Sequence, residues 1–264
     1  MDNDDAITKT ALEELYTIAK KFQADVVHCE KFLQVATKDN LLGRKDYSVI
    51  TYNSSNIVTV TEPTLISENI ADRVVHLQNR QFMWNLWSKL IRRDFFVESG
   101  IEMQDIFGED MLCTICLACS AKRYVKVPNV VNIYRVVDDS LSHKAKSPEK
   151  FFGDWTRAIF QGISYLDKFL NGQKFFQQNP GAKYVVFDCL TMECIMFYLS
   201  QFYAQVPAPQ LDVLIRQEFS KIENFEAVAA FIFSRMNVFQ LNLNQQAQTI
   251  QNLQKQIQQL QGKS

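Results

Sequence analysis

Two acidic clusters stand just ahead of two predicted helices, and each helix leads into a short apolar strand. The first cluster fills residues 2–5 and the second residues 109–110. Apolar residues recur with helical spacing over 12–22, and a β-branched run follows at 24–29. The second cluster opens another apolar helix that is again followed by a strand-like run. Helices that alternate with apolar strands predict the α/β fold class.

The remaining elements of the first 146 residues are expected to be short. Thr10 with Glu13 three residues later is a capping box, which marks a helix start. We expect strands at 47–52, 57–60, 83–90, 124–127 and 132–136, and helices at 69–81, 91–98 and 109–121.

The sequence changes character at Ser147-Pro148, where a serine suited to cap a helix precedes a proline suited to its first turn. From there to 237 the pattern is almost wholly helical and rich in phenylalanine. We therefore predict three parts: an α/β portion at 1–146, an α-helical domain at 147–235, and a coiled-coil or Gln-rich tail at 236–264.

The tail carries a seven-residue repeat. Its two seam positions are Met236, Leu243, Ile250 and Ile257, and Phe239, Gln246, Leu253 and Leu260. Mostly β-branched residues at one seam position and leucine at the other favour a parallel two-stranded coiled coil, and therefore a homodimer. A lone helix folded back on the helical domain and a disordered Gln-rich tail are the alternatives.

Composition excludes several classes of protein. The 264 residues carry a net charge of -1 and no long basic run, which excludes a general nucleic-acid surface. Six cysteines occur without a secretory signal ahead of them, so we expect reduced thiols and a cytoplasmic location. The most apolar stretch, 184–203, contains Asp188 and Glu193, which is typical of a buried helix rather than a membrane span.

The two acidic clusters are the first candidates for chemistry. Asp2 and Asp4 alternate, so in an extended segment both carboxylates point the same way and can hold Mg²⁺ or Mn²⁺. Asp110, with Glu109 beside it, is a candidate general base. The structural alternative is the same for both clusters: acidic residues near a helix start stabilise the helix dipole.

A second group lies between the clusters. On the predicted strand at 83–90, alternate residues place Trp87 and Lys89 on one face. Trp84 and Trp87 are candidates for stacking on a sugar, and Lys89 is a candidate partner for a phosphate. The alternative is that both tryptophans belong to the core and Lys89 to the surface. His143 is a candidate third metal ligand, although a lone surface histidine is the commoner case.

Three cysteines at 113, 116 and 119 superficially resemble an iron–sulfur run. The residues between them suit a buried helix rather than a cluster-binding loop, so we interpret the thiols as packing residues. His28 and His76 receive no role.

The order of these motifs resembles the second half of a family 2 glycosyltransferase catalytic domain of the bacterial GT-A type. The likeness is carried by the acidic opening, the segment 84–90, the Gly-Glu-Asp at 108–110, and Tyr134-Arg135 followed by Ser-Leu-Ser at 140–142. It implies a partial GT-A (Rossmann-like) catalytic domain within 1–146, followed by the helical domain and a coiled-coil helix.

The resemblance also implies roles for the candidates. Asp2 and Asp4 would bind the metal and the diphosphate of a nucleotide-diphosphate sugar, with His143 completing the site and Lys89 assisting. Asp110 would be the base, supported by Glu109. The two tryptophans, at 84 and 87, would form the acceptor side.

The implied reaction is transfer of a sugar, with inversion, to a hydroxyl of a glycan or lipid-linked glycan acceptor during cell-surface polysaccharide synthesis. A peripheral position at the inner face of the cell membrane is expected on the same basis. GT-A domains begin with further βα units ahead of the acidic motif, so we expect this chain by itself to be weakly active or inactive. The rival interpretation is a non-catalytic oligomerisation or scaffold protein that carries a glycosyltransferase remnant.

Overall fold

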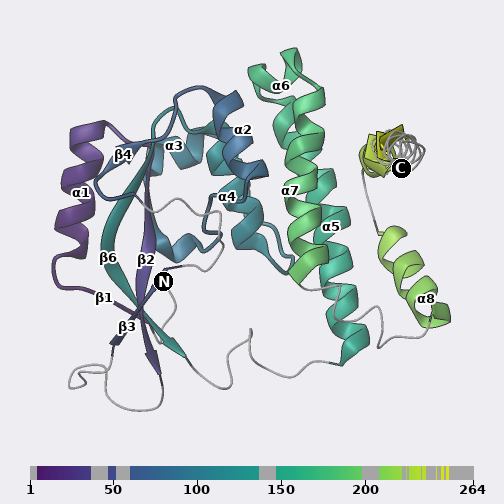
Figure 1. The fold of residues 1–264 in the computed structure, drawn as a ribbon, viewed down its shortest axis with the longest axis horizontal. Helices are drawn as coiled ribbons and strands as arrows, with labels where there is room; N and C mark the ends of the chain where they lie inside the picture. Colours follow the sequence, from purple (N-terminus) through teal and green to yellow (C-terminus); the bar gives the residue numbers. More distant parts are fainter. Residues whose placement is uncertain are drawn as a thin grey trace, which may run out of the picture. The chain divides into compact units, whose positions relative to one another are not determined.

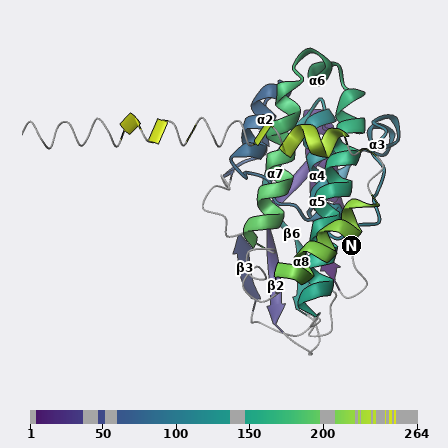
Figure 2. The same ribbon diagram turned by 90° about the vertical axis from the view of Figure 1, so that its right-hand side faces the viewer.

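The computed structural model describes residues 5–36, 47–51, 60–136, 147–197 and 208–221, and shorter helical pieces from 224 onward. Residues 1–223 form one compact unit, and residues 224–264 form a second. Figures 1 and 2 show the described elements in two views. The α/β class predicted from sequence is confirmed.

The first unit is organised around two long parallel strands, β2 (Val26–Ala36) and β6 (Tyr124–Val136). Four short strands pair antiparallel with them at the edges. They are β1 (Ala6–Ile7) and β4 (Thr64–Leu65) along β6, and β3 (Tyr47–Thr51) and β5 (Lys89–Ile91) along β2. The result is a six-stranded mixed sheet in which β2 and β6 are central.

Helices cover both faces of this sheet (Figure 1). Helix α1 (Ala11–Phe22) lies on one face, where its residues Ala11 and Leu15 join a core with valines of β2 and β6. Helices α2 (Ile70–Gln78) and α4 (Glu109–Ser120) lie on the other side, and α3 (Arg93–Glu98) follows β5. Burial of these apolar side chains is the main stabilising contribution.

The C-terminal part of the first unit is helical, as predicted. It comprises α5 (Pro148–Asn171), α6 (Lys174–Gln178), α7 (Gly181–Phe197) and α8 (Ala208–Phe219). Ser147 caps α5 by accepting a hydrogen bond from the N–H of Lys150. Helix α5 packs against α4, α7 and α8, and α7 also packs against α2.

Glycine at position 162 allows α5 and α7 to approach closely. A Cβ placed on Gly162 would lie 2.7 Å from Cδ2 of Leu190, inside van der Waals contact. The boundary predicted near residue 147 stays a prediction, because the contacts of α5 with α4 continue across it.

Three predicted elements were wrong in detail. Residues 83–90 are not a strand: a 3₁₀ turn occupies Leu86–Ser88, and β5 begins only at Lys89. The hydroxyl of Ser88 donates to the carbonyl of Asn85, a local bond that competes with strand pairing.

The two strands predicted at 124–127 and 132–136 are one. Strand β6 continues through Pro128, and the register with β2 shifts at this point, so the sheet accommodates the proline as an irregularity. The capping box is also absent, since the hydroxyl of Thr10 donates to the carboxylate of Glu14 rather than accepting from the backbone.

In the second unit the described residues from 226 onward are helical and include 226–232. The guanidinium of Arg235 lies 5.7 Å from the ring centroid of Phe231. The predicted coiled-coil seam falls almost entirely outside the described residues. Within the described part of the chain, no helix combines the length and the apolar character needed to span a bilayer.

Candidate functional site

The start of helix α4 presents the second acidic cluster. Gly108 is its N-cap, with φ of +83°, a left-handed conformation that favours glycine. A Cβ there would also lie 3.3 Å from Trp155 of α5, whose ring packs edge-to-face on Phe107. The following Glu109 and Asp110 occupy the first turn and are half-buried. The helical domain therefore helps to fix where Asp110 lies.

The loop at 83–88 is bound to this helix start. The N–H of Leu86 donates to Oδ2 of Asp110 at 3.1 Å. One turn further along α4, the hydroxyl of Thr114 donates to the carbonyl of Trp84 at 2.7 Å. Two hydrogen bonds thus hold the tryptophan-bearing loop against the candidate base.

Lys89 holds the same loop from the sheet side. Its Nζ donates to the carbonyls of Met83 at 2.8 Å and Asn85 at 2.7 Å, and lies 3.4 Å from the hydroxyl of Ser88. Loss of hydration on burial lowers the pKa of Lys89 to about 7, and the charge of Asp110 opposes that shift. The ammonium group is therefore already engaged with loop oxygens.

Three aromatic rings gather beside the loop. Trp87 stacks on Tyr134 of β6, with centroids 5.9 Å apart and planes 8° from parallel. Phe32 of β2 meets Trp87 edge-on at 5.0 Å and Tyr134 at 6.1 Å. Trp87 and Tyr134 are half-buried, whereas Trp84 is only 8 % exposed. The two predicted tryptophans thus have different surroundings.

The end of the acidic opening lies next to these rings. The carboxylate of Asp5 accepts a hydrogen bond from the N–H of Arg135 at 2.9 Å, one residue beyond Tyr134. The predicted metal residues Asp2, Asp4 and His143 lie outside the described residues. Among the residues that the structure does describe, no three His, Cys, Asp or Glu side chains are grouped so as to hold a metal ion.

A buried polar cluster was missed by the sequence interpretation. His28 is in register with Lys89 on one side and with Lys126 on the other, so the three share one sheet face. Lys126 forms an ion pair with Glu30, and the hydroxyl of Tyr124 lies 3.0 Å from Nδ1 of His28. Burial, and then the charges of both lysines, hold the pKa of His28 well below its usual value.

A signal for this cluster did exist. Lys126 interrupts the apolar run of β6 and Glu30 directly extends the β-branched run of β2. Both are buried, and charged residues that are buried in a sheet need each other as partners. The pairing of β2 with β6 could not be read from sequence, so neither could the contact.

The three thiols of α4 are buried, which confirms their interpretation as packing residues. Cys116 and Cys119 are fully buried, and Cys113 is 3 % exposed. Loss of hydration raises the pKa of Cys113 to about 11 and that of Cys119 to about 12. These groups therefore stay protonated and unreactive near neutral pH.

Comparison of the sequence with known proteins gives a distant relative and no matching family model. The chain is 24% identical, over 150 residues, to the uncharacterized glycosyltransferase EpsJ of Bacillus subtilis (strain 168). This match covers 56% of the chain and 40% of EpsJ.

The fold is similar to that of a solved structure, S. aureus TarS. Residues 1–349 of TarS in complex with UDP-GlcNAc align with a TM-score of 0.53 at 12% identity, covering 85% of this chain and 57% of that one. A second structure of TarS 1–349 aligns with a TM-score of 0.50 at 14% identity, over 85% of this chain and 55% of that one. The chain thus spans well under two thirds of these relatives, and what it shares with TarS is the fold.

Proposed function

We propose that this chain is part of a glycosyltransferase that moves a sugar from a nucleotide diphosphate to a hydroxyl of a glycan acceptor. One observation carries the proposal: Asp110 opens helix α4 and is hydrogen-bonded to the loop that presents the half-exposed ring of Trp87. A carboxylate next to an aromatic surface suits deprotonation of a sugar hydroxyl. The likeness to EpsJ and to TarS supports the same reaction class.

In the proposed reaction, Asp110 accepts the proton of the acceptor hydroxyl. The hydroxyl oxygen forms a bond to the anomeric carbon while the bond from that carbon to the diphosphate oxygen breaks. Attack opposite the leaving group inverts the configuration. The bond from Leu86 to Oδ2 fixes the carboxylate in advance, and such positioning lowers the barrier. Glu109 would be a supporting contact to the acceptor.

The remaining roles divide between the aromatic group and the loop. Trp87, stacked on Tyr134, is the proposed acceptor surface, and Trp84 contributes mainly to packing because it is buried. We assign Lys89 to holding the loop rather than to a phosphate, since its Nζ already donates to two carbonyls.

A divalent metal, Mg²⁺ or Mn²⁺, belongs to the proposal. Asp2, Asp4 and His143 would hold it, and carboxylate oxygens suit these ions. When bound, the metal supplies charge neutralisation at the leaving diphosphate. The bond between Asp5 and Arg135 supports this placement, because Asp4 directly precedes a residue held beside Tyr134. Synthesis of cell-surface polysaccharide at the inner membrane face, with glycan or lipid-linked acceptors, completes the proposal.

The test is release of UDP from UDP-GlcNAc, with Mn²⁺ and a glycan acceptor present. UDP-GlcNAc is the first donor to try because TarS was solved with it. Because this chain by itself is expected to be weakly active, we expect Asp110→Asn to reduce its UDP release to the background without enzyme, since loss of a general base lowers a rate about 10²- to 10⁴-fold. Asp105→Asn, an exposed carboxylate ahead of the same helix, is the matched control and should leave the rate unchanged.

The scaffold function makes the opposite prediction. If the tail drives dimerisation, Ile250→Ser with Leu253→Ser should dissociate the dimer, as sedimentation would show. A dimer that dissociates in this variant, together with a UDP release rate that Asp110→Asn leaves unchanged, would favour the scaffold.

A further inference from the structure

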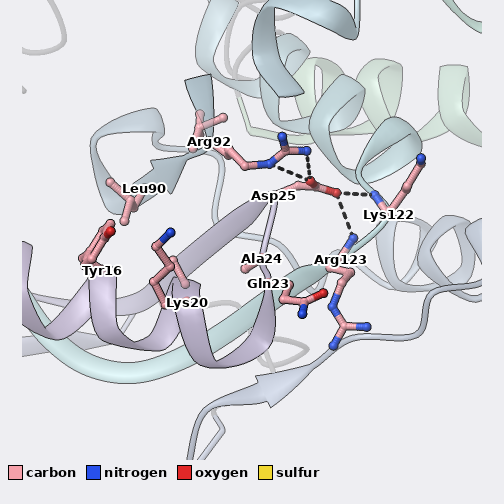
Figure 3. Close-up of a pocket in the computed structure, with 11 residues that line it drawn as sticks. Tyr16, Lys20, Gln23, Ala24, Asp25, Leu90, Arg92, Lys122 and Arg123 are labelled. Atoms are coloured by element: carbon pink, nitrogen blue, oxygen red, sulfur yellow. Dashed lines mark hydrogen bonds and ion pairs between the residues drawn. The ribbon is translucent and has the colours of Figure 1, made fainter. Parts of the chain in front are cut away.

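A pocket of about 600 Å³ opens at the amino ends of the two central strands (Figure 3). One wall is the C-terminal half of α1, the other is strand β5, and Ala24 and Asp25 lie between them. Its volume falls within the range typical of small-molecule sites. Nothing in the proposed transferase reaction uses it.

The pocket is strongly basic. Its lining includes four cations, Lys20, Arg92, Lys122 and Arg123, against a single carboxylate, Asp25. The chain as a whole has a net charge of -1, so this excess of positive charge is local. It arises because cations from three separate segments meet at this end of the sheet: Lys20, Arg92 and the pair at 122–123.

Asp25 offsets only one of the four positive charges, through its ion pair with Arg92. It is 4 % exposed, and it accepts from Nη2 of Arg92 at 2.7 Å and from the N–H groups of Lys122 and Arg123 at 2.7 and 3.0 Å. Figure 3 shows these bonds, which tie Arg92 and the backbone at 122–123 to Asp25. Arg123 is paired with Glu68 at the surface.

Lys20 is the cation best placed to bind a ligand. Its side chain rises from α1 toward Leu90 of β5, and Arg92, the N-cap of α3, lines the same pocket (Figure 3). Within the described residues Lys20 has no carboxylate partner, and its Nζ lies 5.4 Å from the ring centroid of Tyr16. The Tyr16 ring is 59 % exposed and lines the same pocket. Positive charge therefore adjoins an accessible aromatic surface.

The pocket is separate from the candidate catalytic site. Asp25 precedes β2, whereas Phe32 of the aromatic group lies seven residues further along the chain, roughly 20 Å at the rise of a strand. Open α/β sheets bind their nucleotide substrates at the carboxyl ends of parallel strands. This pocket lies at the amino ends of β2 and β6, which is not the edge where that rule places a nucleotide.

We propose that this pocket binds a phosphate-bearing ligand, with its phosphate between Lys20 and Arg92 and its apolar body on Tyr16 and Leu90. A doubly charged phosphate matches the excess of cations better than a singly charged carboxylate does. A soluble phosphate ester and a phospholipid headgroup share this chemistry, and the experiment distinguishes them.

The experiment is calorimetric titration of the full chain with phenyl phosphate, which combines a ring with a phosphate. Saturable binding is expected, with Lys20→Gln raising the dissociation constant about tenfold, the effect of losing one charge-assisted hydrogen bond. Lys21→Gln is the matched control, because Lys21 is the next residue, is exposed and does not line the pocket. Benzoate should bind more weakly than phenyl phosphate.

A second arm identifies the source of the phosphate. The chain is sedimented with vesicles of phosphatidylcholine alone or mixed in equal parts with phosphatidylglycerol. Retention only on the mixed vesicles, reduced by Lys20→Gln and by added phenyl phosphate, assigns the site to lipid headgroups. Saturable phenyl phosphate binding without retention assigns it to a soluble ester.

Two results would overturn the proposal. One is the absence of saturable phenyl phosphate binding, whatever the vesicles show, since retention alone would then reflect general surface charge. The other is an equal loss of affinity in Lys20→Gln and Lys21→Gln, which would place the binding outside the pocket. Neither result bears on the proposed transferase reaction, because no residue of that site is altered.

Discussion

The N–H of Leu86 donates to Oδ2 of Asp110 at 3.1 Å, joining a loop to a helix start 24 residues away. The donor is the backbone N–H of Leu86, so a change of side chain at this position keeps the bond. Proline, which has no N–H, removes it. Leu86 is also the first residue of the 3₁₀ turn, the position where a helix tolerates proline. The contact can therefore be removed by a single substitution.

Leu86→Pro should lower transferase activity about 10- to 100-fold, because Asp110 loses a charge-assisted hydrogen bond worth about 1.5–3 kcal/mol. Leu86→Ala keeps the N–H and is the matched control. The measurement is the rate of UDP release. In an Asp110→Ala background the two Leu86 variants should unfold at the same denaturant concentration. A difference that persists there would mean that proline acts by another route.

Lys89 predicts a pH dependence of stability. Its pKa falls from 10.5 in the unfolded chain to about 7 in the folded one. Between these values the unfolded chain binds more protons at this site, so the contribution of Lys89 to stability rises with pH across this window. That contribution is fully present above 10.5 and is lost as the pH falls through about 7. Lys89→Met should lack this contribution.

The measurement for Lys89 is the urea midpoint of wild type and Lys89→Met at several pH values between 7 and 10.5. The difference between the two proteins isolates this group from the cysteines and from Lys126. Parallel curves would show that Lys89 does not titrate in this range. Lys9→Met, a lysine of the first loop, is the control.

Gly108→Ala should destabilise the protein by more than Gly100→Ala. Both glycines have positive φ, at +83° and +70°, so each alanine costs about 1–2 kcal/mol in backbone strain. Only the alanine at 108 also meets Trp155, at 3.3 Å, since nothing lies within 4 Å of a Cβ at Gly100. Urea unfolding of both variants measures the difference, and equal losses would argue against the contact.

The buried pair of Glu30 and Lys126 should be far more sensitive to single than to double substitution. Glu30→Gln leaves the ammonium of Lys126, which is 4 % exposed, without its counter-charge, and this typically lowers the free energy of unfolding by about 3–5 kcal/mol. Glu30→Leu combined with Lys126→Met removes both charges and should recover most of that loss. Chemical denaturation of the variants checks this. If the double variant is as unstable as the single one, packing rather than charge determines the contribution of this pair to stability.

Trp87→Ala should raise the KM for the acceptor and leave the KM for the nucleotide sugar nearly unchanged. An aromatic ring stacked on another is a stiff surface for a sugar, and its loss typically costs about 0.5–1.5 kcal/mol beyond the area buried. Phe175→Ala is the control aromatic change, since Phe175 packs on Phe176 in the helical part and contacts no described residue of the candidate site. Equal effects on both KM values would remove Trp87 from the acceptor surface.

The sequence correctly predicted those elements that depend on residues a few positions apart. Helical spacing identified α1 and α4, and the serine cap at Ser147 was placed correctly. The acidic start of α4 was likewise visible, because a glycine followed by two carboxylates marks a helix start. Each of these features depends on residues a few positions apart.

What could not be predicted depends on contacts between distant segments. Trp87, Tyr134 and Phe32 come together only because β2 and β6 pair in parallel and the 3₁₀ turn points Trp87 toward them. Lys89 was expected to face a phosphate, since strand alternation cannot reveal that a side chain bonds back to its own loop. Tertiary context decided both.

The six cysteines make the chain a reporter of its own unfolding. All are free and buried, so a thiol reagent should leave the native protein unlabelled and react only as each region opens to solvent. Labelling of Cys29 would report the opening of strand β2, and labelling of the three thiols of α4 would report the opening of that helix. Labelling of Cys189 and Cys194 would report the opening of α7. The order of labelling along the chain would show whether the helices after 147 melt with the sheet or apart from it.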